Sequence, residues 1–363
     1  DEGLAIAAEH GAERSGEALR LQSTLAMVED ASGRSDVAEP LFRGVLDARL
    51  AALGPDHPET LAARINLASF LSRRGEHAPA RAIYEEVYAR QLVVMGPEHP
   101  ETLATRYNLA SLDAAEGEAE RAALDLADLL AIQRRARGDE HPDTLRTLAL
   151  LGSTYAELGR NAEAEPLLLE ALERTEARLG PDHPDALTRR KDYSALLFAL
   201  GRLEECRVEM ERVLAAEERL LGPHHTHTLI SLLNLGSLAG RQGDLERREA
   251  LLVEAHARSR SLPFGEGLRR EVEGDLFRLF RTQGRFEEAL PLAQSTWAEL
   301  VELEGEDSRQ GSALAMIVQD TLYRLGRDAE AAEWEPRSRA HLALLAERGE
   351  LPPWVEEPPA ARE

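Results

Sequence analysis

One octapeptide recurs five times in this chain, and each copy begins 42 residues after the one before it. The copies are LGPDHPET from Leu53, MGPEHPET from Met95, RGDEHPDT from Arg137, LGPDHPDA from Leu179 and LGPHHTHT from Leu221. A period of about 20 to 50 residues is typical of solenoids, in which stacked neighbours share one continuous core. The spacing therefore predicts an array of repeated units.

A glycine marks a second point in every repeat. These glycines follow one another in steps of 42 residues, apart from one step of 41. They are Gly33, Gly75, Gly117, Gly159, Gly201, Gly243, Gly284 and Gly326. Because the glycine persists where the octapeptide fades, we count eight units.

Each unit is predicted to be a pair of helices. Residues 58–75 and 77–96 both carry apolar residues at helical spacing, on either side of Gly75. The glycine and proline of the octapeptide end one helix, and its second proline suits the first turn of the next. We expect an all-α chain of about sixteen helices. First helices are expected near 58–73, 100–115, 142–157, 184–199 and 227–241.

The packing residues of these helix pairs resemble those of the tetratricopeptide repeat. Two units show the pattern, with Asn66, Leu67, Ala68, Leu71, Gly75, Ala80, Tyr84 and Val87 in one and Leu151, Gly152, Tyr155, Gly159, Ala164, Leu168 and Ala171 in the other. The 42-residue length and the GPDHPxTL...NLA pattern resemble the kinesin light chain type. The resemblance covers roughly residues 16–346 and implies a right-handed α-solenoid of about eight helix pairs.

The ends of the chain depart from the pattern. Residues 1–15 are expected to be an irregular lead-in or the boundary of a longer chain, and residues 347–363 a flexible tail rich in proline and glutamate. Trp334, Glu335 and Pro336 are expected to interrupt the last second helix. Between these ends we find no linker, which favours one extended domain.

Composition narrows the possible partners. The net charge of −23 argues against nucleic acid, since phosphate binding needs a basic surface. No apolar run approaches the roughly 18 residues of a membrane span, and no signal peptide pattern is present, so we expect a cytoplasmic protein. The single cysteine, Cys206, falls at a small packing position and is expected to be a buried thiol. Arginine outnumbers lysine by 42 to 1, which we attribute to a high-GC bacterial genome.

No motif of a catalytic site, nucleotide loop or cofactor appears, so we expect no enzyme, cofactor or metal. The recurring histidines have two possible roles, as ligands or pH sensors, or as structural groups that bond a neighbouring loop or helix end. They are His57, His99, His141, His183 and His225. We favour the structural role, because successive copies lie a repeat apart. His224, His225 and His227 form a local cluster that lacks a fourth zinc ligand.

The resemblance implies that first helices line a concave groove that binds peptides. We call the residues mapped to it the groove set: Asn66, Ser69, Arg73, Asn108, Ser111, Arg146, Ser153, Lys191, Asn234, Ser237 and Arg241. The three asparagines would read a peptide backbone, since an amide both donates and accepts hydrogen bonds. Alternatively, they bond the adjacent helix. The row is broken at Leu150 and Asp192.

The predicted groove is comparatively basic in an acidic chain. It holds Arg20, Arg73, Arg146, Lys191, Arg241, Arg281 and Arg324 against Asp30, Glu157 and Glu271. Arginine suits carboxylates or phosphates. The leading hypothesis is a non-enzymatic scaffold that binds an extended acidic peptide or a partner helix.

Two alternatives stay open. The resemblance implies that the chain could be the C-terminal docking or sensor segment of a larger signalling enzyme, such as a bacterial Ser/Thr protein kinase or a nucleotide-binding signalling protein. It could also be a self-associating spacer. The oligomeric state and the identity of the partner are open.

Overall fold

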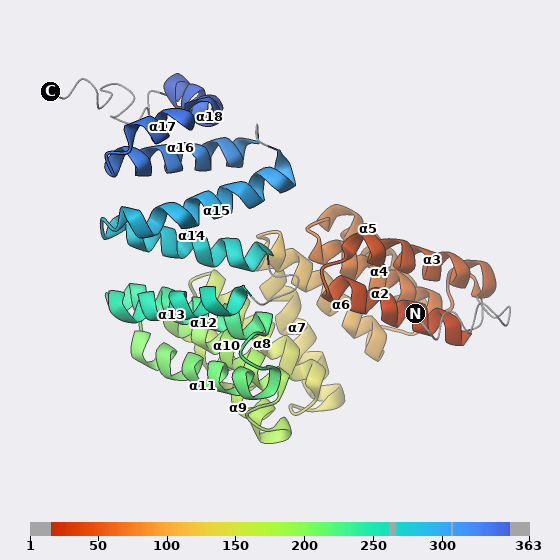
Figure 1. Cartoon of the computed structure of the whole chain (residues 1–363). Helices are drawn as coiled ribbons and strands as arrows, with labels where there is room; N and C mark the ends of the chain where they lie inside the picture. The colour runs from red at the N-terminus through yellow and green to blue at the C-terminus, as the bar shows by residue number, and fades with distance from the viewer. Residues whose placement is uncertain (1–15, 261–265, 306–307, 349–363) are drawn as a thin grey trace. The chain divides into compact units, whose positions relative to one another are not determined.

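The computed structural model describes residues 16–260, 266–305 and 308–348. Over these ranges it is all-α, as predicted, with no strand (Figure 1). These ranges contain seventeen helices where about sixteen were expected, because the last second helix is divided in two. The first helices are α2 (Gly16–Ala31), α4 (Pro58–Arg73), α6 (Pro100–Ala115), α8 (Pro142–Glu157), α10 (Pro184–Ala199), α12 (Thr226–Gln242), α14 (Glu266–Thr282) and α16 (Arg309–Arg324). The second helices are α3 (Ser35–Leu53), α5 (His77–Val94), α7 (Ala119–Arg137), α9 (Asn161–Leu179), α11 (Leu203–Leu221), α13 (Leu245–Ser259), α15 (Phe286–Glu304), α17 (Asp328–Glu333) and α18 (Glu335–Arg348).

The predicted helix boundaries agree closely with these. Four of the five predicted first helices have the expected bounds, and α12 is one residue longer at each end. Residues 95 and 96, included in the predicted second helix, lie beyond the end of α5. The last second helix is divided at Trp334 into α17 and α18, as predicted. The predicted lead-in and most of the predicted tail lie outside the described residues.

Local chemistry explains why the helices begin and end at these residues. Gly159 has φ +71° in the turn between α8 and α9, a left-handed conformation that strains any residue with a Cβ atom. Gly54 follows α3 with φ +84°, and Pro58 then occupies the first turn of α4. Proline is tolerated there because its missing N–H has no intrahelical partner to lose.

The contacts between residues divide the chain into two compact units, residues 1–196 and residues 197–363, which we call unit 1 and unit 2. The division falls inside α10, so no linker marks it. Within each unit, helices pack on those that follow them in the chain, as α8 on α9 and α12 on α13 do (Figure 1). This consecutive packing is that of an α-solenoid.

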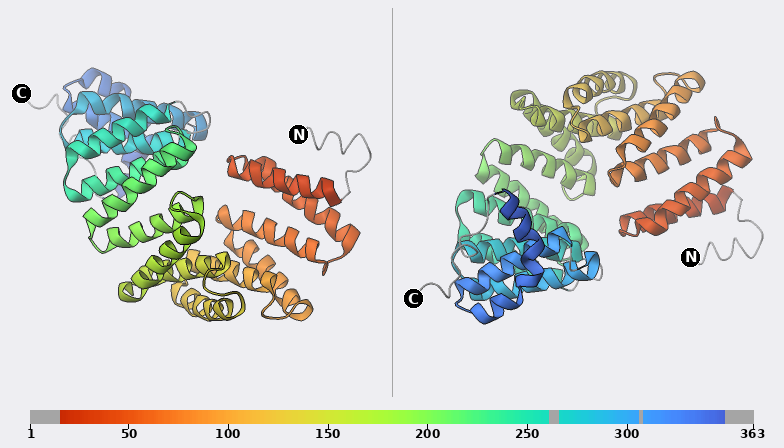
Figure 2. Two further views of the ribbon diagram at one scale, coloured as in Figure 1. Left: turned by 90° about the horizontal axis from the view of Figure 1, so that it is seen from below. Right: turned by 90° about the horizontal axis from the view of Figure 1, so that it is seen from above.

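The first helices of unit 1 also touch one another. α6 contacts both α4 and α8, and the views in Figure 2 show the helices of this unit, drawn in red through yellow to green, stacked in chain order. Close approach within a pair depends on small residues. A Cβ atom on Gly152 of α8 would lie 2.8 Å from Cγ of Leu168 on α9, which is closer than real Cβ contacts.

Unit 1 has a core of alanine and leucine with few aromatic rings. Phe42 of α3 and Phe70 of α4 lie with ring centroids 5.2 Å apart, among buried alanines such as Ala38 and Ala68. Farther along the chain, Leu126 and Leu148 belong to a second cluster of the same kind. Small residues thus allow the dense helix packing of this unit.

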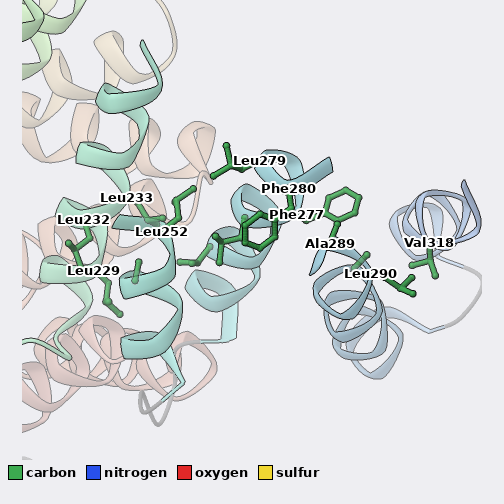
Figure 3. Packing of buried hydrophobic residues seen from close by; sticks show 14 of the residues in the cluster. Leu229, Leu232, Leu233, Leu252, Phe277, Leu279, Phe280, Ala289, Leu290 and Val318 are labelled. Atoms are coloured by element: carbon green, nitrogen blue, oxygen red, sulfur yellow. The ribbon is translucent and has the colours of Figure 1, made fainter. Parts of the chain in front are cut away.

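Unit 2 has larger side chains in its core. Phe277 and Phe280 of α14 pack with Leu252 of α13 and Leu290 of α15 in one cluster, which extends to Val318 of α16 (Figure 3). Cys206, the predicted buried thiol, is indeed buried, and burial raises its pKa to about 11. The thiol is therefore protonated at neutral pH.

Candidate functional site

The groove set lies on the first helices of both units, and in α4 its members already have partners within unit 1. The Asn66 amide donates to the Ser23 hydroxyl at 3.3 Å. The hydroxyls of Ser69 and Tyr84 lie 2.8 Å apart. The Arg73 guanidinium donates from Nε to Oδ2 of Asp30 at 2.9 Å. Asn66 therefore bonds a neighbouring helix, α2, which is the structural alternative for the asparagines.

Further along unit 1, the groove set is only partly accessible. Asn108 and Ser111 of α6, Ser153 of α8 and Lys191 of α10 are half-buried. Arg146 of α8 is more exposed. For Asn108 and Ser111, packing of first helices accounts for this burial, since α6 touches both α4 and α8.

Unit 2 presents the groove set openly. Asn234, Ser237 and Arg241 are all exposed on α12. Their spacing of three and four residues places them on one helix face. The Arg241 guanidinium lies over the Phe198 ring, 4.7 Å from its centroid, which holds the long side chain in place. This row is the most accessible polar surface that the groove set provides.

The prediction of a basic groove needs correction, because several of its arginines are neutralised by carboxylates of the same unit. Arg73 pairs with Asp30 in unit 1. In unit 2, Arg281 and Arg324 both pair with Asp320, at 2.6 and 3.0 Å. The sequence count did not include Asp320, and it could not show that Asp30 was already paired. A charge paired in this way contributes less to binding an acidic ligand.

A cluster of charged residues around Arg146 was only partly predicted. The Arg146 guanidinium lies 4.4 Å from the centroid of the Tyr107 ring on α6, and Nη1 of Arg189 on α10 is 2.8 Å from Oδ2 of Asp192. Burial raises the pKa of the Tyr107 hydroxyl, whereas the positive charges of Arg146 and Arg189 lower it. Both arginines therefore act on the same ring from different first helices.

Asp192 stands where the predicted asparagine row is broken. Burial raises the pKa of its carboxyl, and the nearby Arg189 and Lys191 offset only part of this effect. Sequence reasoning noted the break in the row but did not include Tyr107, Arg189 or Asp192 in the groove set. Their departure from the residues at the same positions of other repeats is the signal that could have found them.

The five recurring histidines are structural in this fold, as favoured from the sequence. Each caps a first helix: its Nδ1 accepts a hydrogen bond from the backbone N–H two residues later. The distances are 3.2 Å for His57, 3.3 Å for His99, 3.2 Å for His141, 3.1 Å for His183 and 3.2 Å for His225. Helix capping explains the recurrence of histidine beside proline.

His224, His225 and His227 make separate contacts in unit 2, and among the described residues no group of three or more His, Cys, Asp or Glu side chains could hold a metal ion. His225 uses Nδ1 as the helix cap, and its ring packs edge-on against His227 at 5.1 Å. His224 Nδ1 lies 3.3 Å from the backbone oxygen of Arg258.

Among the residues that the structure describes, no helix is long and apolar enough to cross a membrane.

Comparison with known proteins identifies the repeat. Two tetratricopeptide repeat models match the chain, one over residues 17–92, 66–128 and 185–261 and the other over residues 144–185. The first alone accounts for more than half of the chain. No curated protein sequence matches the chain significantly.

Solved structures with similar folds come from several organisms. A protein described as a kinesin light chain with nearly identical TPR-like repeats, from Podosopora anserina, is 28% identical over 55% of this chain and 95% of its own, with a TM-score of 0.46. BtubC from P. vanneervenii is 20% identical over 66% of this chain and 91% of its own, with a TM-score of 0.48.

A third similar structure is larger than this chain. It is a signal transduction ATPase with numerous domains and a tetratricopeptide repeat sensor, from Pyrococcus horikoshii. Its identity is 13% over 88% of this chain, with a TM-score of 0.52, and this chain spans half of its length. At this level of identity the likeness shows the fold alone.

Proposed function

Because the chain belongs to the tetratricopeptide repeat family, we propose that it is a non-enzymatic scaffold whose first helices bind an extended acidic peptide or a partner helix. The observation that carries this proposal is the exposed row on α12. There, Asn234 offers an amide, Ser237 a hydroxyl and Arg241 a held guanidinium along one helix face. These groups can bond both a peptide backbone and a carboxylate side chain. We further propose that this scaffold works in the cytoplasm.

The proposal is tested by finding a partner and then removing the row. The full chain is used as bait, the partner segment is mapped by cross-linking, and the matching peptide is titrated against the wild type and two variants of the row. Replacing Asn234 with Ala should weaken binding by about 0.5 to 1.5 kcal/mol with little change in salt dependence. Replacing Arg241 with Ala should weaken binding most at low salt, where charge pairs are least screened.

The control is Arg212→Ala. Arg212 is an exposed arginine of unit 2 on the second helix α11, so its loss removes the same charge from another face. Binding that is lost with Arg212→Ala but kept with the α12 variants would contradict the proposed surface. Asn108→Ala and the Arg146→Ala/Lys191→Ala double variant extend the same titration to the groove set of unit 1.

A second candidate function is that of a docking or sensor segment in a larger signalling protein. The similar ATPase from Pyrococcus horikoshii, which is described as having a tetratricopeptide repeat sensor, is compatible with it. The test is the coding sequence on either side of this chain. A kinase or nucleotide-binding domain in the same reading frame would support the role, and neighbouring unrelated genes would contradict it.

A further inference from the structure

Unit 1 contains a cavity that holds an unusual concentration of arginine. Its volume is about 150 Å³, and it lies between the start of α8, the end of α9 and the start of α10. Arg146, Arg178 and Arg189 line it together with Asp143 and Asp185. One water takes about 30 Å³ in the liquid, so the cavity has room for a small polar group of several heavy atoms. We refer to it as the arginine cavity.

The repeats themselves provide an internal control for these arginines, because each position can be compared with residues 42 places away. The position of Arg178 holds Ala52, Val94, Ala136 and Leu220 in other repeats. The position of Arg189 holds Leu21, Ala63, Thr105, Thr147 and Ser231. The position of Arg146 holds Ala62, Ala104, Thr188 and Ile230, and a second arginine only at Arg20. Repeat packing needs no arginine at these positions, so their convergence calls for another cause.

The three guanidiniums are held in place by groups that leave hydrogen-bond donors unused. Arg178 donates from Nη1 to the backbone oxygen of Glu140 at 3.1 Å, and Arg189 from Nη1 to Asp192 at 2.8 Å. Arg146 is packed on the Tyr107 ring and lies 3.5 Å from Oδ1 of Asp143. A guanidinium has five N–H donors, and these contacts use only some of them.

The charges around the cavity match a ligand with one negative charge. Three arginines and two aspartates line it, which leaves one net positive charge. Two flanking side chains pair directly with lining residues: Arg137 pairs with Asp143, and Asp192 pairs with Arg189. Their opposite charges cancel, so they leave the net charge of the lining unchanged. A dianionic group would meet Asp143 and Asp185 without a matching positive charge. A single carboxylate meets no such excess of negative charge.

We infer that the arginine cavity is a subsite for one carboxylate side chain, Asp or Glu, of a peptide bound along the first helices of unit 1. This inference rests on the proposed scaffold function and gives it a specific anchor point. The carboxylate would accept hydrogen bonds from Arg146, Arg178 and Arg189, in the planar geometry that suits guanidinium and carboxylate groups. The cavity thereby makes one acidic position of the partner peptide more important than the others.

The experiment measures fluorescence anisotropy of labelled peptides with the full chain at low salt. The probes are peptides of four Gly-Ser-Glu repeats, four Gly-Ser-Gln repeats and four Gly-Ser-phosphoserine repeats. We expect the glutamate peptide to bind the wild type most tightly. The Arg146→Gln/Arg178→Gln double variant should weaken this binding about tenfold or more, a loss of about 1.4 kcal/mol.

The matched control is Arg135→Gln, which removes an exposed arginine of α7 that pairs with Glu98 in the same unit. It should leave the affinity unchanged, and a thermal melt of each variant checks that it remains folded. The inference is overturned if the glutamate peptide does not bind, if the double variant binds it as the wild type does, or if the phosphoserine peptide binds more tightly. A natural partner that still binds through α12 in those cases would leave the scaffold function intact.

Discussion

The two units follow the same repeat plan with different side chains, and the difference shows which parts of the plan are required. In unit 1, alanine and leucine dominate the core. In unit 2, Phe277 and Phe280 join the core, and the rings of Trp297 and Trp334 pack edge-on at 4.8 Å. The helix pairs form in both cases. The apolar stripe and the turn chemistry are therefore required, whereas the size of the core residues can vary.

Helix caps make the same point. In unit 1, His141 caps α8 with its ring nitrogen. In unit 2, Ser308 caps α16 with its hydroxyl, which accepts from the Gly311 N–H at 3.0 Å. What the repeat needs is an acceptor for an N–H group of the first turn, and either side chain provides it.

The largest effects should come from truncating a buried leucine at one repeat position in each unit. Leu151 of unit 1 and Leu235 of unit 2 are both buried. Replacing either with Ala should cost about 2 to 5 kcal/mol. Since every tryptophan of the chain lies beyond residue 196, tryptophan fluorescence reports on unit 2 and far-UV circular dichroism on both units.

In a solenoid, energetic coupling passes through nearest neighbours. Leu151→Ala should therefore lower the circular dichroism transition and leave the fluorescence midpoint near that of the wild type. Leu235→Ala should lower both. If Leu151→Ala shifts the two midpoints equally, the units unfold as one and the comparison fails.

A second matched pair tests the packing of the helices within a unit. A Cβ atom on Gly152 would lie 2.8 Å from the Leu168 side chain, whereas on Gly236 it would lie 3.4 Å from Leu252. Gly152→Ala should therefore overpack unit 1 and cost about 1 to 3 kcal/mol. Gly236→Ala should stabilise unit 2 by about 0.5 to 1 kcal/mol, since glycine is unfavourable inside a helix. Chemical denaturation of both variants checks the opposite signs, and equal losses would refute this account.

Much of the fold could be predicted from the sequence because helix ends depend on nearby residues. The proline and glycine of the octapeptide act within one turn, so the bounds of α4, α6 and α8 followed from their spacing. The division inside α10 could not be predicted in the same way. It depends on contacts between distant residues, and no composition change marks it.

The candidate site was less predictable, because a side chain's role depends on its partner. The sequence identified Arg73 as a groove residue, but its carboxylate partner Asp30 lies 43 residues earlier. The arginine cavity was also missed, although Arg178 and Arg189 depart from their repeat positions. A comparison of each residue with those 42 places away would have revealed the cavity.

The histidine caps provide a prediction of intermediate size. Replacing His141 of unit 1 with Ala should remove the acceptor for the Asp143 N–H and cost about 1 kcal/mol. His141→Asn should keep most of the stability, because asparagine is itself a preferred cap. In unit 2, Ser308→Ala should cost a similar amount. Thermal melts that show no difference between His141→Ala and His141→Asn would mean that the ring nitrogen does not act as a cap.

The smallest expected effects come from two carboxyl groups with opposite pKa shifts, one in each unit. In unit 1, burial raises the pKa of Asp192, and Arg189 and Lys191 offset this only in part. In unit 2, burial also acts to raise the pKa of Glu273, but hydrogen bonds from His256 and Thr296 and the positive charges of His256 and Arg269 outweigh it and lower the pKa. Ionisation therefore disfavours the folded state at Asp192 and favours it at Glu273.

The opposite pKa shifts predict opposite changes in stability when each carboxyl group is replaced by an uncharged amide. Asp192→Asn restores the residue found at Asn66, Asn108 and Asn234, and it should raise the melting temperature at pH 7 by removing a poorly compensated charge. The gain should shrink as the pH falls through the raised pKa, because the aspartate is then protonated in the folded state. Glu273→Gln should lower the melting temperature at pH 7, and this loss should shrink only as the pH falls through the lowered pKa of Glu273. Circular dichroism follows the first variant and tryptophan fluorescence the second. If Asp192→Asn is less stable than the wild type at pH 7, the ion pair with Arg189 outweighs burial, and the raised pKa of Asp192 is wrong.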